Sequence, residues 1–170
     1  MFLLDANVLI TAHNTYYNIE QVPEFWDWLR HMGESDQLRM PLEIYEEIKD
    51  GSKDDELDAL FAWVNDADNK AAILLDEAVD PAAVALVIEQ GYASDLTDDE
   101  LEEIGRDPFL VAYGLADVAN RTVVTTEVSK PSRIRQNRKL PDVCNTFGLK
   151  CCDTFSLTKQ LGFKTGWKNP

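Results

Sequence analysis

The sequence alternates short apolar segments of strand composition with longer segments of helical periodicity. The chain opens with Phe2-Leu3-Leu4, which runs directly into Asp5, and the pattern from Ala6 onward is helical. Residues 122–126 are β-branched throughout, which is typical of a central strand. Strands that alternate with helices in this way pair in parallel. The order therefore predicts an α/β fold with three layers and a mainly parallel sheet.

Proline, capping residues and glycine mark the expected ends of the helices. Apolar residues at helical spacing predict helices over residues 23–32, 41–48, 57–64, 81–91, 107–120, 141–147 and 154–162. Thr97 to Glu100 has the pattern of a capping box. Residues 71–75 fit either a strand or a helix. We expect a polar loop over residues 127–140 and a short strand over residues 149–152. We expect a single domain over residues 1–162 and a frayed tail over 163–170.

Length and composition exclude several classes of protein. The chain has 170 residues, 45% of them hydrophobic and 28% charged, which suits one globular domain with a core of its own. The longest apolar run is seven residues, Ala82 to Ile88, too short for a membrane helix, and the N-terminus does not resemble a signal peptide. Three cysteines without a Cys-x-x-Cys motif indicate neither a disulfide framework nor a zinc ribbon, so we expect a cytoplasmic protein.

The net charge of −15 is unevenly distributed along the chain. Residues 1–128 hold 7 Lys and Arg against 29 Asp and Glu, whereas residues 129–170 hold 9 against 2. Five basic residues fall close together in the expected polar loop: Lys130, Arg133, Arg135, Arg138 and Lys139. Such a group is either a solvated loop or an arm that contacts phosphates beside an acidic site. The asymmetry favours the phosphate-binding arm.

Acidic residues stand where the expected strands end. Asp5 follows the first strand, Glu127 follows residues 122–126, and Asp153 follows residues 149–152. In parallel sheets, functional groups collect at the carboxyl ends of the strands. Asp5 and Glu127 are therefore the strongest candidates for a site.

Other acids stand on or at the start of the expected helices. Glu43, Glu46, Glu47 and Asp50 share one helix face, which could be merely solvated. Asp107 and Asp142 each begin a helix, so both could serve only as a cap or a first-turn acid. Carboxylates placed together resist burial unless a cation joins them. Because Mg²⁺ and Mn²⁺ prefer carboxylate oxygens, the acids predict a divalent metal site.

The order of these motifs resembles the PIN-domain nucleases, in particular a prokaryotic branch of PIN-like proteins. The resemblance runs from Leu4-Asp5-Ala6-Asn7-Val8 through Glu47-Ile48 and the helix that begins at Asp107 to the strand that ends in Glu127. The aromatic segments Tyr16-Tyr17 and Phe25 to Trp28, and the segment Leu140 to Cys144, also fit that branch. The likeness covers about residues 1–162. The fold it implies is a compact α/β/α sandwich with a parallel sheet.

The resemblance implies a metal-dependent endoribonuclease. Asp5, Glu47 and Asp107 would hold one or two Mg²⁺ or Mn²⁺ ions, with Glu127 and Asp142 at the rim. Asn7 and Thr126 would orient water or ligands. The five basic residues of the expected polar loop at 130–139, which we call the basic loop, would hold phosphates of the RNA. Glu127 replaces the family's commoner aspartate, and Glu43 or Glu46 could stand in for Glu47. The resemblance also implies a second copy of the chain as a partner in a homodimer. If the protein is the toxin of a toxin–antitoxin pair, an antitoxin protein is a further expected partner.

Two other functions compete with this interpretation. Phosphatases of the haloacid-dehalogenase type also begin with a strand that ends in aspartate, but they need a second acid two residues later, where this chain has Asn7. A PIN-like fold could instead be retained as a binding module for nucleic acid or protein without catalysis. That alternative predicts a broken set of acids, whereas Asp5, Glu47 and Asp107 are all present.

Overall fold

The central sheet is parallel and short-stranded. The computed structural model describes residues 1–51 and 59–168. Within them, four parallel strands lie in the order β2-β1-β3-β4: β1 Phe2–Leu4, β2 Leu38–Arg39, β3 Thr122–Val124 and β4 Lys150–Cys152. The register pairs Leu4 with Val124 across β1 and β3, and Val124 with Cys152 across β3 and β4. The carboxyl ends of β1, β3 and β4 therefore meet at one edge.

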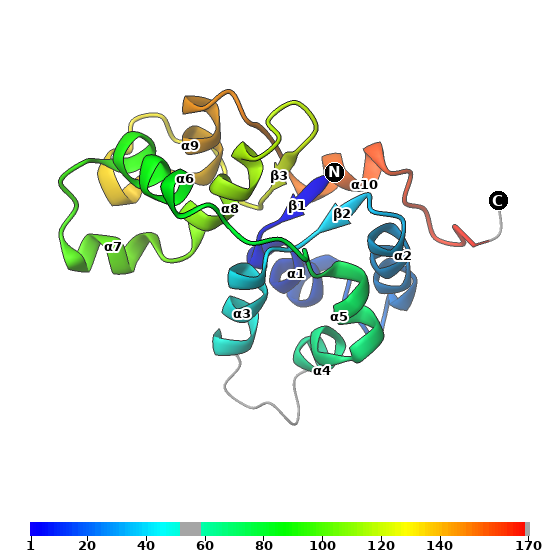
Figure 1. Ribbon diagram of the computed structural model, residues 1–170. Coiled ribbons are helices and arrows are strands. Elements are labelled where there is room, and N and C mark those ends of the chain that lie inside the picture. Colours follow the sequence, from blue (N-terminus) through cyan, green and yellow to red (C-terminus); the bar gives the residue numbers. More distant parts are fainter. Residues whose placement is uncertain (52–58, 169–170) are drawn as a thin grey trace.

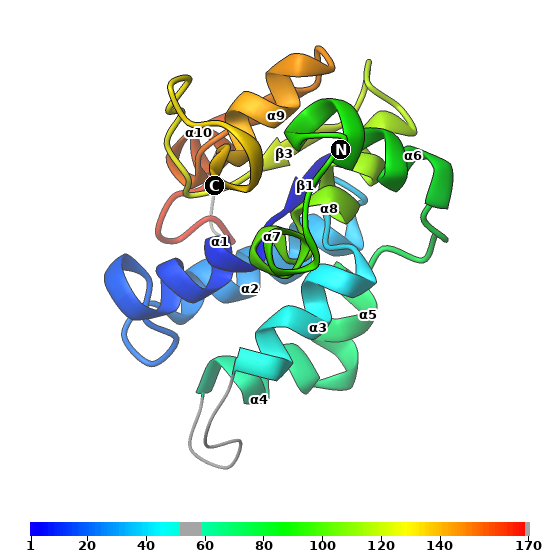
Figure 2. The same ribbon diagram turned by 90° about the vertical axis from the view of Figure 1, so that its left-hand side faces the viewer.

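Helices cover both faces of this sheet. The N-terminal half contributes α1 Ala6–Thr11, the π-helical turn η1 Ala12–Tyr16, α2 Pro23–Glu34, α3 Leu42–Gly51, α4 Ala59–Asn65 and α5 Ala67–Ile73. The second half contributes α6 Pro81–Leu86, the π-helical turn η2 Val87–Tyr92, α7 Asp98–Ile104, α8 Asp107–Leu115, the 3₁₀ turn η3 Arg135–Asn137, α9 Leu140–Thr146 and α10 Thr154–Gln160. The helices α6, α8 and α9 lie on one side of the strands, and α1, α2 and α5 on the other (Figures 1 and 2). The predicted α/β/α sandwich with a parallel sheet is confirmed.

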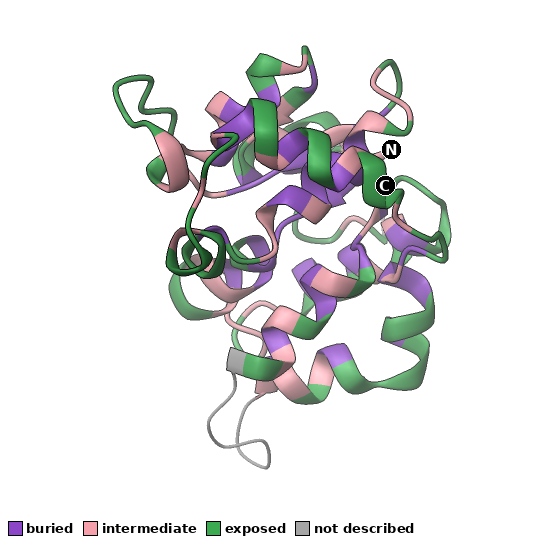
Figure 3. Cartoon of the chain, turned by 60° about the vertical axis from the view of Figure 1, so that its left-hand side comes forward, coloured by how far each residue is buried: buried purple, intermediate pink, exposed green. Residues whose placement is uncertain are grey.

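The core follows from the apolar composition of the strands and of α8. Leu3, Leu4, Val123 and Val124 are fully buried, and buried residues concentrate along the strands and the inward sides of the helices (Figure 3). Helix α8 is buried on nearly all sides, as its sequence predicts. A Cβ on Gly114 would lie 2.3 Å from Leu149 Cδ2, so any other residue here would require the side chain of Leu149 to shift. No helix among the described residues is both long and apolar enough to cross a membrane.

Several element boundaries differ from the sequence prediction. Helix α8 ends at Leu115 rather than near residue 120, because the chain turns there to enter β3. The strand β2 was not predicted, since two residues are too short to show an alternating pattern. The ambiguous segment 71–75 divides between the end of α5 and a bridge from Leu74 to Met40. The helix expected over 57–64 is observed from Ala59, and its first two positions lie outside the described residues.

Two aromatic residues of the expected tail, Phe163 and Trp167, contact the N-terminal half of the chain. Phe163 packs against three aromatic rings, with centroid distances of 5.6, 5.4 and 5.1 Å to Tyr17, Phe25 and Trp28. Trp167 Nε1 donates a hydrogen bond to a backbone oxygen of α2 at 3.0 Å. The apolar side chains of this segment therefore pack on a surface that the sequence alone does not show.

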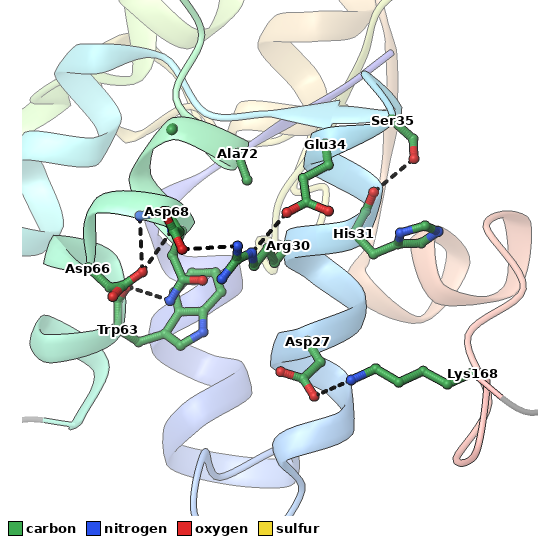
Figure 4. A network of polar contacts seen from close by, with 12 residues as sticks. Asp27, Arg30, His31, Glu34, Ser35, Trp63, Asp66, Asp68, Ala72 and Lys168 are labelled. Atoms are coloured by element: carbon green, nitrogen blue, oxygen red, sulfur yellow. Dashed lines mark hydrogen bonds and ion pairs between the residues drawn. The ribbon is translucent and has the colours of Figure 1, made fainter.

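Ion pairs connect α2 to Lys168 and to α5 (Figure 4). Lys168 Nζ lies 2.8 Å from Asp27 Oδ2. Arg30 bridges Glu34 at 2.9 Å and Asp68 of α5 at 3.2 Å. These contacts are exposed and contribute little each, so the aromatic packing carries most of the stability of this face.

Candidate functional site at the sheet edge

Asp5 is the buried acid at the carboxyl end of β1. It is 2% exposed and caps α1, where its Oδ1 accepts a hydrogen bond from the backbone N–H of Asn7 at 3.4 Å. Its Oδ2 accepts a hydrogen bond from the hydroxyl of Thr125 at 2.7 Å. Burial raises the pKa of Asp5, and the charge of Glu127 raises it further, whereas the hydrogen bonds from Thr125 and Asn7 oppose the shift.

Glu127 lies next to Asp5 because the strands β1 and β3 are in register. Its backbone N–H donates to Thr125 Oγ1 at 3.2 Å, so one hydroxyl connects the two acid-bearing segments. Both carboxylate oxygens of Glu127 are bound within the chain. Lys139 Nζ lies 2.6 Å from Oε1, and the backbone N–H of Leu140 donates to Oε2 at 2.7 Å. The side chain is therefore held in place on the loop side of the site.

Arg106 brings the helices α3 and α8 together at the same edge. Its guanidinium donates to the backbone oxygen of Glu43 at 2.8 Å and to Asp50 Oδ2 at 2.6 Å. Asp107, the next residue, begins α8. Glu47 of α3 and Asp107 interact electrostatically with each other and with Asp5.

Asp107 is the centre of this electrostatic cluster. Burial, followed by the negative charges of Asp5, Glu127 and Glu47, raises its pKa to about 8. The hydroxyl of Tyr92 donates to Asp107 Oδ2 at 3.5 Å. Burial also raises the pKa of Glu47, and the charge of Asp5 adds to that shift. The structure thus brings Asp5, Glu47, Asp107 and Glu127 within electrostatic reach, and we call these four residues the acid cluster.

Of the acids on α3, Glu47 is the one that joins the acid cluster. Glu46 is exposed. Glu43 faces the hydroxyl of Tyr113, whose pKa rises to about 12 through burial and through the charge of Glu43. The alternative that Glu43 or Glu46 takes the place of Glu47 therefore finds no support in the positions of these side chains.

Asp142 and Asp153 have other contacts. Asp142 Oδ1 accepts from the hydroxyl of Ser129 at 2.5 Å, and Oδ2 accepts from the backbone N–H of Lys130 at 2.7 Å. The carboxylate of Asp142 thus fixes the start of the basic loop. Asp153 caps α10 by accepting from the backbone N–H of Ser156 at 2.7 Å, as its position in the sequence indicates.

Three of the five basic residues have partners within the chain. Arg135 binds Asp95 at 2.6 Å and Glu100 at 2.7 Å, which anchors the loop to α7. Arg138 donates to the carbonyl oxygens of Gly91 and Asp142 and to Thr146 Oγ1. Lys139 pairs with Glu127, as described above.

Lys130 and Arg133 are the basic residues that remain available to a ligand. Both are exposed, and neither side chain has a hydrogen bond or ion pair to the described parts of the chain. With Lys139 they line an open hollow of about 480 Å³, the basic hollow. The prediction of phosphate contacts therefore applies most directly to Lys130 and Arg133.

Thr125 and Tyr92 are site residues that sequence reasoning missed. The sequence analysis assigns a supporting role to Thr126, but Thr125 is the residue whose hydroxyl binds Asp5, and both threonines line a hollow next to Glu127. Alternation along an extended strand would put Thr125 and Glu127 on one face, but only the register shows that Asp5 lies there. Tyr92 is remote in sequence from every motif, so no local pattern indicates its contact with Asp107.

The acid cluster offers the chemistry of a cation site without being closed around one. Across residues 1–51 and 59–168, no three His, Cys, Asp or Glu side chains are arranged to hold a metal ion as they stand. The donors are nevertheless all carboxylates, one of them nearly inaccessible to water and one with a pKa of about 8. Such a group gains stability from a proton or a divalent cation.

Comparison with known proteins identifies one family. Neither the curated proteins nor the solved structures gave a match. The family model described as "Domain of unknown function (DUF4411)" matches residues 2–165, which include every strand and helix described above. The chain therefore belongs to the DUF4411 family.

Proposed function

We propose that this chain is a metal-dependent nuclease that hydrolyses phosphodiester bonds in RNA. The observation that supports the proposal is the acid cluster. Four carboxylates from separate elements influence one another at the carboxyl edge of a parallel sheet, and the pKa of Asp107 rises to about 8. A group of solvated acids would not include a carboxylate as buried as Asp5. Perturbed acids grouped at this edge are typical of catalytic sites.

The donor set suits a hard divalent cation. Asp5, Glu47 and Asp107 would hold Mg²⁺ or Mn²⁺, with Glu127 at the rim, since these ions prefer carboxylate oxygens. When bound, the ion would lower the pKa of its water and neutralise charge on the phosphate. A cation would also compete with Lys139 for Glu127, because both carboxylate oxygens now have partners.

The residues of the chain prepare this site in two ways. Thr125 and the backbone N–H of Asn7 hold the carboxylate of Asp5 in a fixed orientation. Asp107, with a pKa of about 8, holds a proton at neutral pH until a cation displaces it. Binding of the cation is thus coupled to release of a proton.

RNA cleavage by the purified protein tests the proposal. We expect cleavage with Mn²⁺ or Mg²⁺ and none in EDTA. Asp5→Asn and Glu47→Gln should each lower the rate at least about 100-fold, because changes even to groups that merely support a metal ligand cost 10–100-fold. Glu46→Gln is the matched control, since Glu46 lies on the same helix but is exposed. Equal rates for Glu47→Gln and Glu46→Gln would contradict the proposed ligand set.

A non-catalytic binding module is the second candidate function. The pairing of Glu127 with Lys139 favours it, because this contact occupies an acid that the nuclease would use. A binding module would bind RNA or a protein equally well in EDTA and would cleave nothing. A toxin paired with an antitoxin, acting in the cytoplasm, would be a biological use of the nuclease activity, and a homodimer is compatible with either function.

A further inference from the structure

A hollow beside the acid cluster extends from Glu127 to residues that have no part in the proposed metal chemistry. It measures about 490 Å³ and lies at the carboxyl ends of β3 and β4. Glu127 and Ser129 line it on the side of β3, Thr154 and Phe155 on the side of β4, and Tyr16 from the helical turn η1. A ligand in this hollow would lie directly next to Glu127.

The exposed aromatic ring of Phe155 forms one side of this hollow. Phe155 is 57% exposed, although a phenylalanine normally lies in a core. Its ring is held against Tyr16, with the centroids 5.1 Å apart and the planes tilted by 43°. Val128 adds a further exposed apolar side chain to the same hollow. An exposed, positioned ring of this kind is a surface on which a flat ring can stack.

Thr154 brings a hydroxyl without a partner to the same hollow. The residue is 2% exposed, and its Oγ1 has no hydrogen-bond partner in the described parts of the chain. A buried hydroxyl without a partner costs free energy, so such groups are rare in folded proteins. Thr154 is one of the residues that line the hollow, and a rotation about χ1 would be needed to turn its buried hydroxyl toward a bound group.

The charges around the hollow exclude a phosphate and favour a neutral ring. Among the residues that the structure describes, the lining includes Glu127 and Asp153 but no lysine, arginine or histidine. Phosphates have a separate place nearby: Ser129 lines this hollow, and the next residue, Lys130, lines the basic hollow with Arg133. A nucleotide can therefore place its base in one hollow while its backbone continues into the other.

We propose that the hollow at Phe155 binds one unpaired nucleobase of a single-stranded RNA. The base stacks on Phe155, the hydroxyl of Thr154 hydrogen-bonds to its edge, and the flanking phosphates contact Lys130 and Arg133. The substrate class rests on the proposed nuclease function. A duplex keeps its bases paired and stacked inside the helix, so it cannot fill this site without losing that stacking.

Binding of a short fluorescein-labelled single-stranded RNA in EDTA, followed by fluorescence anisotropy, tests the site without cleavage. Phe155→Ala should weaken binding about tenfold, since stacking of one base on an aromatic ring is worth that much. Phe155→Trp should restore it, because tryptophan also stacks. Leu86→Ala is the matched control, since Leu86 is an exposed apolar side chain of α6 that does not line the hollow.

Thr154→Val distinguishes binding from a structural role. Valine has the shape of threonine without the hydroxyl. If the hydroxyl serves only a ligand, this variant should weaken RNA binding about threefold or more while its melting temperature stays the same or rises. A lower melting temperature would show that the hydroxyl stabilises the fold, and the role given to Thr154 would be wrong.

Two further results would overturn the base site. One is that an RNA of the same length whose nucleotides lack bases binds as tightly as the RNA with all its bases. The other is Phe155→Ala with the affinity of the wild type. Failure of the nuclease is separable from both: a chain that cleaves nothing with Mn²⁺ but binds RNA through Phe155 keeps the base site and loses the nuclease function. A chain that cleaves RNA with Mn²⁺ but binds it equally well without Phe155 keeps the nuclease function and loses the base site.

Discussion

Replacement of Asp107 by asparagine should stabilise the protein in the absence of metal at pH 8. Burial of the Asp107 carboxyl group, followed by the negative charges of three other acids, raises its pKa from 3.8 to about 8. Ionising it in the folded chain is therefore unfavourable. Asparagine has nearly the same shape and can still accept the hydrogen bond from Tyr92, but it carries no charge.

The size of the effect follows from the two pKa values. Below about pH 4, Asp107 is protonated in both the folded and the unfolded chain, and its charge costs nothing. Between about pH 4 and pH 8 the unfolded chain loses the proton first, so the free energy of unfolding falls by about 1.4 kcal/mol per pH unit. The loss reaches an upper limit of about 4 kcal/mol at pH 7 and about 6 kcal/mol at pH 8, and stays constant above that.

One smaller effect opposes this gain. Where Asp107 is ionised in the folded chain, at about pH 8 and above, asparagine removes a negative charge from the first turn of α8, which costs about 0.3–1 kcal/mol through the helix dipole. The burial effect is several times larger at pH 8 and vanishes at pH 4. Asp107→Asn should therefore be more stable than the wild type at pH 8 by a few kcal/mol, and equal or slightly less stable at pH 4.

Urea denaturation at pH 4 and pH 8 in EDTA measures this difference. Asp80→Asn is the matched control, because Asp80 also precedes a proline at the start of a helix but is exposed. The control should change stability by less than about 0.5 kcal/mol at both values of pH, since asparagine caps a helix as well as aspartate. A loss of stability at pH 8 for Asp107→Asn, or the same change at both pH values, would refute the electrostatic reasoning.

Three further outcomes are expected. Millimolar Mn²⁺, but not Na⁺ at the same ionic strength, should raise the melting temperature of the wild type by calorimetry and leave that of Asp107→Asn nearly unchanged. Thr125→Val should lower the free energy of unfolding by about 1–3 kcal/mol in urea titrations, because it leaves the buried carboxylate of Asp5 without its hydroxyl donor. Thr125→Ser keeps the hydroxyl and should retain most of the wild-type stability. Lys130→Ala combined with Arg133→Ala should reduce the slope of log K for RNA binding against log salt concentration by about 1.4, which is about 0.7 for each lost phosphate contact. Arg135→Ala should lower the melting temperature and leave that slope unchanged, because Arg135 pairs with acids of the chain.

Local signals in the sequence were enough to indicate the architecture. Proline at the start of a helix and the capping box at Thr97 depend on neighbouring residues alone, and the structure confirms that box in both directions. Strands that run directly into Asp5 and Glu127 likewise predict where acids will stand on a parallel sheet. The fold class and two of the four members of the acid cluster follow from such short-range patterns.

Tertiary structure decided which side chains meet. The choice of Glu47 among the acids of α3 depends on the rotation of that helix against α8, which the contacts of Arg106 help to set. The pairing of Lys139 with Glu127 depends on how the loop returns to the sheet. These contacts join residues distant in sequence, and a helix face or a loop with several charges allows many pairings of similar energy until the core selects one. The sequence alone therefore determined which kinds of groups gather at the sheet edge, and only the packed core determined which of them touch.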